Sequence, residues 1–185
     1  FRGIMGHEFV GEIAAAAEAP ERVGERVAGE INIVCGSCGA CRAGRRSHCE
    51  HRSVLGIRGH DGAFAEYLTL PVQNLHPVPT AVPDEAAVFT EPLAAALQIT
   101  RQVHIGPETH VLVVGAGRLG QLIAQVLRLT GCDLAVAARR ERQRSLLSAA
   151  GIPWLAEDDV PAGAFDLSVE ASGAPGGLVL ARRAL

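Results

Sequence analysis

The sequence predicts an α/β protein in two parts, a β-rich barrel or sandwich followed by a doubly wound parallel sheet. Three observations lead to this fold class. Short, partly alternating segments are divided by glycine and proline at the start of the chain, prolines gather at Pro77, Pro79 and Pro83, and strand and helix patterns alternate after them. We therefore expect one domain over residues 1–85 and a second over residues 86–185.

The first part contains three segments that we expect to be strands. Phe9–Ile13, Arg26–Ala28 and Ala63–Leu70 carry partial alternation and are bounded by turn residues. The cysteine-rich stretch 35–49 is expected to be an excursion from this sheet structure.

The prolines mark a connector, because proline cannot donate a hydrogen bond to a sheet. Asp84 is then expected to cap a helix that runs through Val88, and Glu91-Pro92 to open a second helix, since proline is tolerated in a first turn.

An alternation of strands and helices follows. The apolar stretch His110–Val114 predicts a strand that is covered on both faces. Apolar residues at helical spacing predict a helix over 119–127. The later elements are expected as strands at Leu134–Ala138 and Phe165–Val169 and a helix at Glu141–Ala150.

Composition excludes several classes of protein. The chain is 48% hydrophobic and 4% aromatic, which suits a core rich in alanine, valine and leucine. A net charge of −3 gives no reason to expect a nucleic-acid partner. No apolar run approaches the ~20 residues that a membrane span needs, so no membrane partner is expected.

Four cysteines, Cys35, Cys38, Cys41 and Cys49, are separated by two, two and seven residues. Three closely spaced thiolates and a fourth that returns after a longer gap can complete a tetrahedron around Zn²⁺, which is a closed, structural site. An iron–sulfur cluster fits the last gap poorly, and disulfides are disfavoured in a chain with five cysteines. Thiolate ligands persist in a reducing compartment, which predicts a cytoplasmic protein. Cys132 is expected in the core.

Gly115-Ala116-Gly117-Arg118-Leu119-Gly120 follows a predicted strand and opens a predicted helix. This is the context in which a G-x-G-x-x-G run binds a dinucleotide: Gly115 turns the chain, Gly117 lets the backbone approach the pyrophosphate, and Gly120 lets the helix pack closely. Arg118 and Leu119 begin the helix whose free N–H groups would face the phosphates.

The end of the next strand bears on the choice of nicotinamide cofactor. A carboxylate there would accept a hydrogen bond from the ribose 2′-hydroxyl of NAD(H), but Ala138 is followed by Arg139 and Arg140. We predict that Arg139 favours NADP(H) over NAD(H). The alternative is that Arg139, Arg140, Arg142 and Arg144 form a solvated helix face.

With these features in place, the pair His7-Glu8 within Gly6–Gly11 becomes a candidate reactive site. The chain resembles the zinc-dependent medium-chain dehydrogenases/reductases, the family of zinc alcohol, polyol and threonine dehydrogenases. The matching motifs span nearly the whole chain: Gly6-His7-Glu8, Gly24–Val27, the four cysteines, Gly62–Tyr67, Glu91–Ala94, the glycine run and Val169–Gly173.

The resemblance implies a GroES-like β-barrel catalytic domain with a structural-zinc lobe, followed by a partial Rossmann domain. It implies a second, catalytic zinc held by His7 and Glu91, with Glu8 either a ligand or a neighbour that exchanges with water, and cofactor contacts at Ala171 and Gly173. Such a zinc acts as a Lewis acid while hydride moves between the substrate and the nicotinamide. The implied substrate is a small alcohol or polyol, or the matching carbonyl, and the implied assembly is a homodimer or homotetramer.

The family's first catalytic ligand, a cysteine, and its proton relay lie upstream of the motif at His7, and its last nucleotide-domain strands follow the point where this chain ends. We therefore expect a fragment that is inactive alone. Two other classes stay open: a zinc-free quinone or enoyl reductase, and a protein that binds zinc and nucleotide without turnover.

Overall fold

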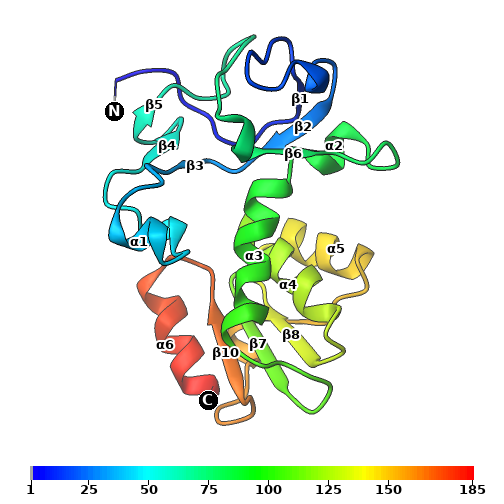
Figure 1. The fold of residues 1–185 in the computed structure, drawn as a ribbon. Helices are drawn as coiled ribbons and strands as arrows, with labels where there is room; N and C mark the ends of the chain where they lie inside the picture. Colours follow the sequence, from blue (N-terminus) through cyan, green and yellow to red (C-terminus); the bar gives the residue numbers. More distant parts are fainter. Residues whose placement is uncertain (1) are drawn as a thin grey trace. The chain divides into compact units, whose positions relative to one another are not determined.

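The computed structural model describes residues 2–185, which divide into two compact units, one ending at Glu91 and the other spanning Pro92–Leu185. Figure 1 shows short strands and long connections in the first unit, and strands flanked by helices in the second. The predicted domain boundary lies after residue 85, and the helix that begins at Asp84 belongs to the first unit.

The first unit contains two three-stranded sheets. One has the order β1-β2-β6 and is antiparallel; the other has the order β3-β4-β5. The strands are short: β1 (Gly11–Glu12), β2 (Arg26–Gly29), β3 (Asn32–Ile33), β4 (Ser53–Leu55), β5 (Gly59–His60) and β6 (Leu75–Pro77). The strands predicted at Phe9–Ile13 and Arg26–Ala28 therefore correspond to β1 and β2.

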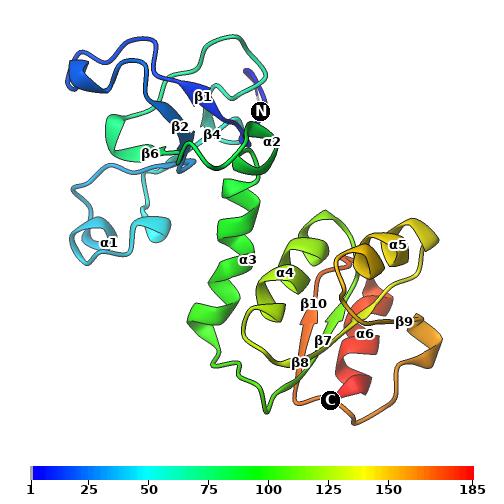
Figure 2. The same cartoon turned by 90° about the vertical axis from the view of Figure 1, so that its right-hand side faces the viewer.

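Helical turns in the first unit lie between these strands. They are η1 (Pro20–Arg22), α1 (Gly39–Arg42), η2 (Arg46–His48), η3 (Val72–Asn74) and α2 (Asp84–Ala87). Figure 2 shows the segment that carries α1 projecting away from the β1-β2-β6 sheet, as an excursion would.

The cap predicted for α2 is wrong. Pro83 occupies the N-cap position without a side-chain cap, and Asp84 is the first helical residue. The Asp84 carboxylate instead pairs with Arg26 at 3.1 Å. The Arg26 guanidinium also donates hydrogen bonds to the carbonyls of Pro79 and Val82, which holds it next to the start of α2.

The strand predicted at Ala63–Leu70 is also wrong, since the segment has no regular secondary structure. A strand needs a continuous ladder with a neighbour. The amides of Ala63 and Phe64 bind the carbonyls of Gly6 and Met5, and the ring of His60 contacts the Thr69 carbonyl oxygen at 2.7 Å. These contacts hold the segment in place but do not form a ladder.

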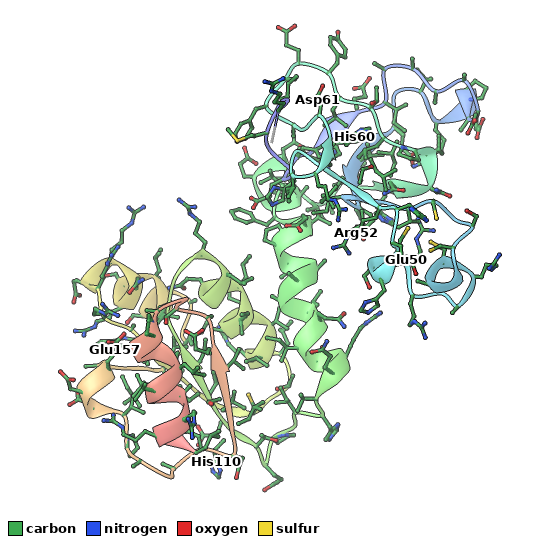
Figure 3. The ribbon with its side chains drawn as sticks, turned by 90° about the vertical axis from the view of Figure 1, so that its left-hand side faces the viewer. Glu50, Arg52, His60, Asp61, His110 and Glu157 are labelled. Atoms are coloured by element: carbon green, nitrogen blue, oxygen red, sulfur yellow. The ribbon has the colours of Figure 1, made fainter. Side chains whose placement is uncertain are left out.

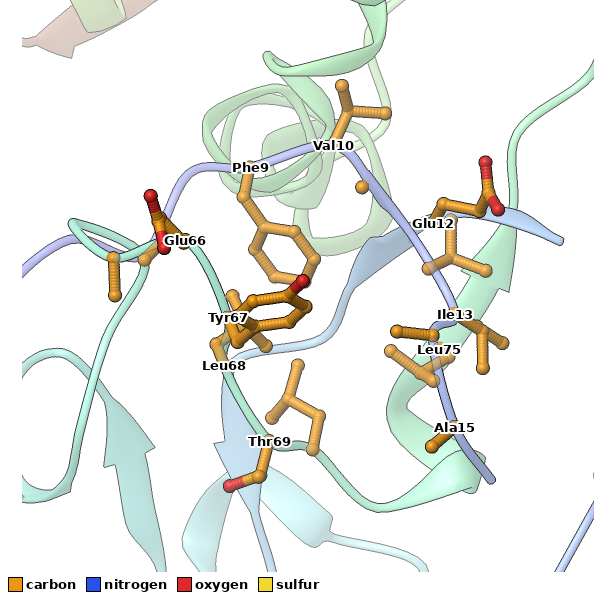
Figure 4. Close-up of a pocket in the computed structure, with 16 residues that line it drawn as sticks. Phe9, Val10, Glu12, Ile13, Ala15, Glu66, Tyr67, Leu68, Thr69 and Leu75 are labelled. Carbon is orange, nitrogen blue, oxygen red and sulfur yellow. The ribbon is translucent and has the colours of Figure 1, made fainter. Parts of the chain in front are cut away.

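This irregular segment forms one wall of a groove of about 850 Å³ within the first unit. The other wall comes from the chain around β1, and Figure 4 shows the ring of Phe9 pointing from it toward the stretch that carries Tyr67 and Leu68. Leu68 and Leu70 also pack against the small buried cluster of Ile31, Val54 and Leu55.

The second unit is built on a four-stranded parallel sheet with the order β10-β7-β8-β9. Its strands are β7 (His110–Val114), β8 (Asp133–Ala137), β9 (Trp154–Leu155) and β10 (Leu167–Glu170). The helical elements of this region are α3 (Thr90–Gln102), α4 (Arg118–Arg128), α5 (Glu141–Ala149), η4 (Glu157–Asp159) and α6 (Pro175–Ala184). The predicted α/β alternation is confirmed.

Alternation along β7 divides the core of this unit into two layers. Val111 and Val113 pack with residues of α4 and α5 such as Leu127 and Leu147. Leu112 and Val114 point to the other face, where residues of α6 cover them. Figure 1 shows α6 on one side of the sheet and α4 and α5 on the other. This parallel sheet covered on both faces is the partial Rossmann fold that the sequence predicts.

Candidate metal centres and nucleotide site

His7, Glu8 and Glu91 come together within the first unit. One ligand atom from each residue lies within 4.8 Å of the others, and His7 Nε2 is 3.9 Å from Glu91 Oε2. His7 precedes β1, while Glu91 lies in the first turn of α3. One imidazole nitrogen and two carboxylates make a donor set suited to a divalent cation, and three protein donors leave one position of a tetrahedral site for a further ligand.

Tight backbone packing positions His7. Gly6 has φ 98°, and a Cβ at this position would lie 2.5 Å from the Phe64 ring. A side chain would therefore meet both backbone strain and a clash. The Ala63 amide donates a hydrogen bond to the Gly6 carbonyl at 2.8 Å, so the residue before His7 is held from two directions.

Glu91 lies in an environment that disfavours its charged form. Burial raises the pKa of this carboxyl above its ordinary value, the nearby His7 lowers it, and the carboxylates of Glu8 and Glu30 raise it further. A cation bound between these groups would neutralise the repulsion between Glu8 and Glu91, so the cluster has the electrostatics of a metal site.

The four predicted zinc ligands of the first unit also converge. Cys35, Cys38, Cys41 and Cys49 offer Sγ atoms within 4.8 Å of one another, and all four are free thiols. Cys35 and Cys38 precede the short helix α1, Cys41 lies inside it, and Cys49 follows η2. The longer gap before Cys49 contains the last residue of α1 and the helical turn η2, after which the chain returns to the cluster.

The thiols differ in how readily they ionise. Backbone N–H groups of Ser37 and Cys38 lower the pKa of the Cys35 thiol to about 6, while burial raises the pKa of the Cys41 thiol to about 12. The Cys49 and Cys35 sulfur atoms are 3.6 Å apart. Four sulfur ligands at such distances match the closed coordination of a structural zinc site.

In the second unit, the glycine run joins β7 to α4 as predicted. Gly115 turns with φ 100°, and a Cβ on Gly120 would lie 1.9 Å from the Gly115 carbonyl oxygen, so only glycine lets the helix start this close. By contrast, a Cβ on Gly117 would meet no atom within 4 Å. That open space is the approach that a pyrophosphate would need.

A pocket of about 290 Å³ opens at this turn. Its lining includes the predicted residues Gly115, Gly117, Arg139 and Ala171, whereas Arg118, Leu119, Gly120 and Gly173 are not among its lining residues. Gly120 acts instead through helix packing, and Arg118 and Leu119 form the first turn of α4.

The pocket also contains residues that sequence reasoning missed. Gln143, Glu157 and Ser172 line it. Ser172 could have been found from its place between Ala171 and Gly173, but Glu157 carries no local signal because it follows a two-residue strand.

Glu170 holds the turn after β10 that faces the glycine run. Its carboxylate accepts hydrogen bonds from the Ser172 amide at 2.7 Å and from the Ser172 hydroxyl and the Gly173 amide, and these bonds lower the pKa of Glu170. A Cβ on Gly115 would lie 2.6 Å from the Ser172 nitrogen, so the turn closes directly against the first glycine.

The geometry thus defines a class of protein with two potential metal centres in one unit and a dinucleotide-type pocket in the other. Comparison with known proteins agrees. Residues 2–80 match the alcohol dehydrogenase GroES-like domain family. An L-threonine 3-dehydrogenase of Chelativorans sp. (strain BNC1) is 44% identical over 131 residues, which are 69% of this chain and 37% of that protein.

Solved structures show the same fold. An alcohol dehydrogenase from Escherichia coli CFT073 complexed with NADH has a TM-score of 0.75 at 33% identity, covering 98% of this chain and 51% of that one. A zinc-binding dehydrogenase from Sinorhizobium meliloti 1021 bound to NADP has a TM-score of 0.84 at 29% identity, covering 95% of this chain and 56% of that one.

The chain belongs to the zinc-dependent medium-chain dehydrogenase/reductase family, as its motifs predict. It spans about half, or less, of the length of the relatives that it matches. Among residues 2–185, no helix combines the length and the apolar character that a membrane crossing requires.

Proposed function

We propose that this protein is a zinc-dependent oxidoreductase that transfers a hydride between a nicotinamide cofactor and an alcohol, polyol or matching carbonyl. The observation that carries the proposal is the convergence of His7, Glu8 and Glu91 in the unit that also holds the four-thiol cluster. An open donor set beside a closed one is the combination expected of one catalytic and one structural zinc. A zinc-free reductase would have no use for either cluster.

In this proposal His7 and Glu91 hold the catalytic zinc, and Glu8 is a ligand or exchanges with water. When bound, a zinc ion with an open position supplies Lewis-acid chemistry toward an alcohol or carbonyl oxygen. The packing of Gly6 against Phe64 fixes the approach of His7, and the start of α3 fixes Glu91. The chain thereby presents its donors in advance, and they need little rearrangement.

The glycine turn and its pocket would hold the nicotinamide cofactor, whose ring carries the hydride. We propose NADP(H) over NAD(H), because Arg139 lines the pocket where a 2′-phosphate would be read and the β8 strand ends in Ala137 without a carboxylate. Related structures contain either NADH or NADP, so residues of this chain must decide the preference.

The identity to an L-threonine 3-dehydrogenase makes L-threonine the first substrate to test, ahead of other secondary alcohols and polyols. A homodimer or homotetramer and a cytoplasmic location, where free thiols persist, are part of the same proposal.

The test is made in the complete protein, which includes the segments that this chain does not span. It replaces His7 by alanine and compares zinc content and alcohol-dependent NADP⁺ reduction with those of the unaltered complete protein. We expect two zinc ions per chain to fall to one and kcat/KM to drop by roughly a hundredfold or more, since even outer-shell partners of a metal contribute 10–100-fold. His104→Ala, at an exposed position outside both clusters, is the matched control. One zinc per chain in the unaltered protein and no turnover with any alcohol would instead identify a binding protein.

A further inference from the structure

The edge of the nucleotide pocket carries an ion pair that the proposed cofactor preference does not explain. Arg139 Nε lies 3.2 Å from a carboxylate oxygen of Glu157, and both residues line the pocket. Arg139 follows the end of β8, and Glu157 opens η4 just after β9. Figure 3 shows Glu157 in the second unit, well separated from His110 at the amino end of β7.

Sheet pairing brings these two residues together. β8 and β9 are parallel with Ala137 opposite Leu155, and the Ala138 amide donates a hydrogen bond to the Leu155 carbonyl at 2.9 Å. Because the two strands are parallel, both end at the carboxyl side of the sheet, and the side chains that follow them meet there. The register of β8 and β9 therefore places the two side chains within reach of each other.

The neighbouring arginines do not take the same part. Arg144 donates a hydrogen bond to the Ala138 carbonyl and stacks over the Trp154 ring at 4.9 Å. Arg142 is exposed and is not among the pocket-lining residues. Arg139 and Arg140 are the basic residues in the lining, and Arg139 is the one engaged by a carboxylate.

This arrangement sets up a competition. A guanidinium that is bound to a carboxylate offers fewer donors to a phosphate, and a carboxylate close to a phosphate repels it. The Arg139 side chain is 68% exposed, so it can turn from Glu157 to a ligand at small cost. Among the pocket-lining residues Glu157 is the acidic one, and it alone can oppose a 2′-phosphate in this way.

We propose that Glu157 is a specificity-determining positioning residue, which holds Arg139 and thereby limits how strongly the pocket selects a 2′-phosphate over a 2′-hydroxyl. The inference rests on the proposed nucleotide site. It predicts that the unaltered protein favours NADP(H) only moderately, and that removing the charge at position 157 sharpens the preference.

The test measures binding directly, with adenosine 2′,5′-bisphosphate and AMP as probes in calorimetric titrations of the purified protein. These ligands differ by the 2′-phosphate and need no turnover. Glu157→Gln should tighten the bisphosphate on the order of fivefold, the upper range for one exposed ion pair, and leave AMP unchanged. The ratio of the two dissociation constants is a readout that a merely structural role would not move.

Two comparisons separate the mechanism from simple loss of charge. Asp158→Asn removes the same charge from the neighbouring, exposed position of η4, outside the pocket lining, and should leave the ratio nearly unchanged. In an Arg139→Gln background, Glu157→Gln should lose most of its effect, because Glu157 acts through Arg139.

Equal ratios for Glu157→Gln and the unaltered protein would overturn the inference, as would an equal shift from Asp158→Asn or a full effect without Arg139. If the unaltered protein bound neither probe, the proposed nucleotide site itself would fail. Binding of both probes with no response to position 157 would remove the inference alone.

Discussion

The interior of each unit is stabilised by different interactions. In the second unit, β7, β8 and the helices around them bury a continuous apolar core, with Val111, Leu112 and Leu127 fully inaccessible. In the first unit, the buried cluster comprises Ile31, Val54 and Leu55, and the strands are two to four residues long. We therefore expect the first unit to depend more on bound metal and polar crosslinks for its stability, and the second unit to depend on apolar burial.

This difference matches what each unit does in the proposal. A dinucleotide pocket needs a rigid turn on a well-packed sheet, and the glycine run is supported in that way. A metal centre assembled from distant residues can instead contribute its own binding energy to folding. The comparison predicts that the two units respond differently to the same kind of perturbation.

The largest effect is expected from loss of the thiol cluster. Cys49→Ser should lose one zinc ion per chain, and its first unit should no longer show a cooperative unfolding transition. The reason is that structural zinc contributes about 10 kcal/mol or more of folding free energy in small domains. Cys132→Ser, in the second unit, should keep the full zinc content. Metal analysis and calorimetric melting test this, and a Cys49→Ser protein that retained all its zinc would break the comparison.

A cavity in the apolar core of the second unit should have the next largest effect. Leu127→Ala removes a side chain that is 0% exposed and should lower the free energy of unfolding by roughly 2–5 kcal/mol. Leu129→Ala, two residues along at 84% exposure, should change it by less than about 0.5 kcal/mol. Denaturant titration of both variants measures the difference, and similar losses would contradict the assigned core.

The polar counterpart in the first unit is Asn74, whose side chain is 0% exposed. Its amide nitrogen donates hydrogen bonds to the carbonyls of Glu30 and Asn32, which ties η3 to the chain around β3. Asn74→Ala should lower the free energy of unfolding by about 1–3 kcal/mol, because two part-buried carbonyls lose their hydrogen-bond donor.

The exposed neighbour Gln73→Ala is the control for Asn74. It should leave the denaturant midpoint nearly unchanged. If Asn74→Ala matched Gln73→Ala, the first unit would not rely on this crosslink.

The smallest effect is expected at the amino ends of the parallel strands. Asp166 accepts hydrogen bonds from the His110 amide at 2.9 Å and from the His110 ring at 3.0 Å, and these bonds lower the pKa of Asp166 below its ordinary value of 3.8. A carboxyl whose pKa is lower in the folded state stabilises that state above pH 3.8, and the contribution disappears as the pH falls through the lower value.

Asp166→Asn should therefore lower the melting temperature slightly at neutral pH, and the gap to the unaltered protein should close at acid pH. Glu108→Gln, an exposed carboxylate on the loop before β7, is the control and should show no such convergence. A gap that stayed constant with pH would show that the carboxyl contributes through packing and not through its charge.

Local patterns were sufficient for some elements of the structure and insufficient for others. β7 and α4 were predictable because apolar alternation and helical spacing lie within the elements themselves. The strand predicted at Ala63–Leu70 was wrong, although its residues suit a strand. A strand needs a partner strand to pair with, and an alternating pattern within one segment does not specify that partner. Asp84 was misplaced as a cap for a similar reason, since Arg26 reaches its carboxylate from β2.

The sequence by itself determined the closely spaced features: four cysteines that can share one metal, a glycine turn between strand and helix, and the family to which the chain belongs. The resemblance implied that His7 and Glu91 share a metal, and the tertiary structure places their side chains 3.9 Å apart. That Glu157 faces Arg139 was decided by the tertiary structure alone. The physical reason is range. Turns and helices are set by a few adjacent residues, whereas contacts between residues far apart in the chain are set by strand register and by where the elements pack.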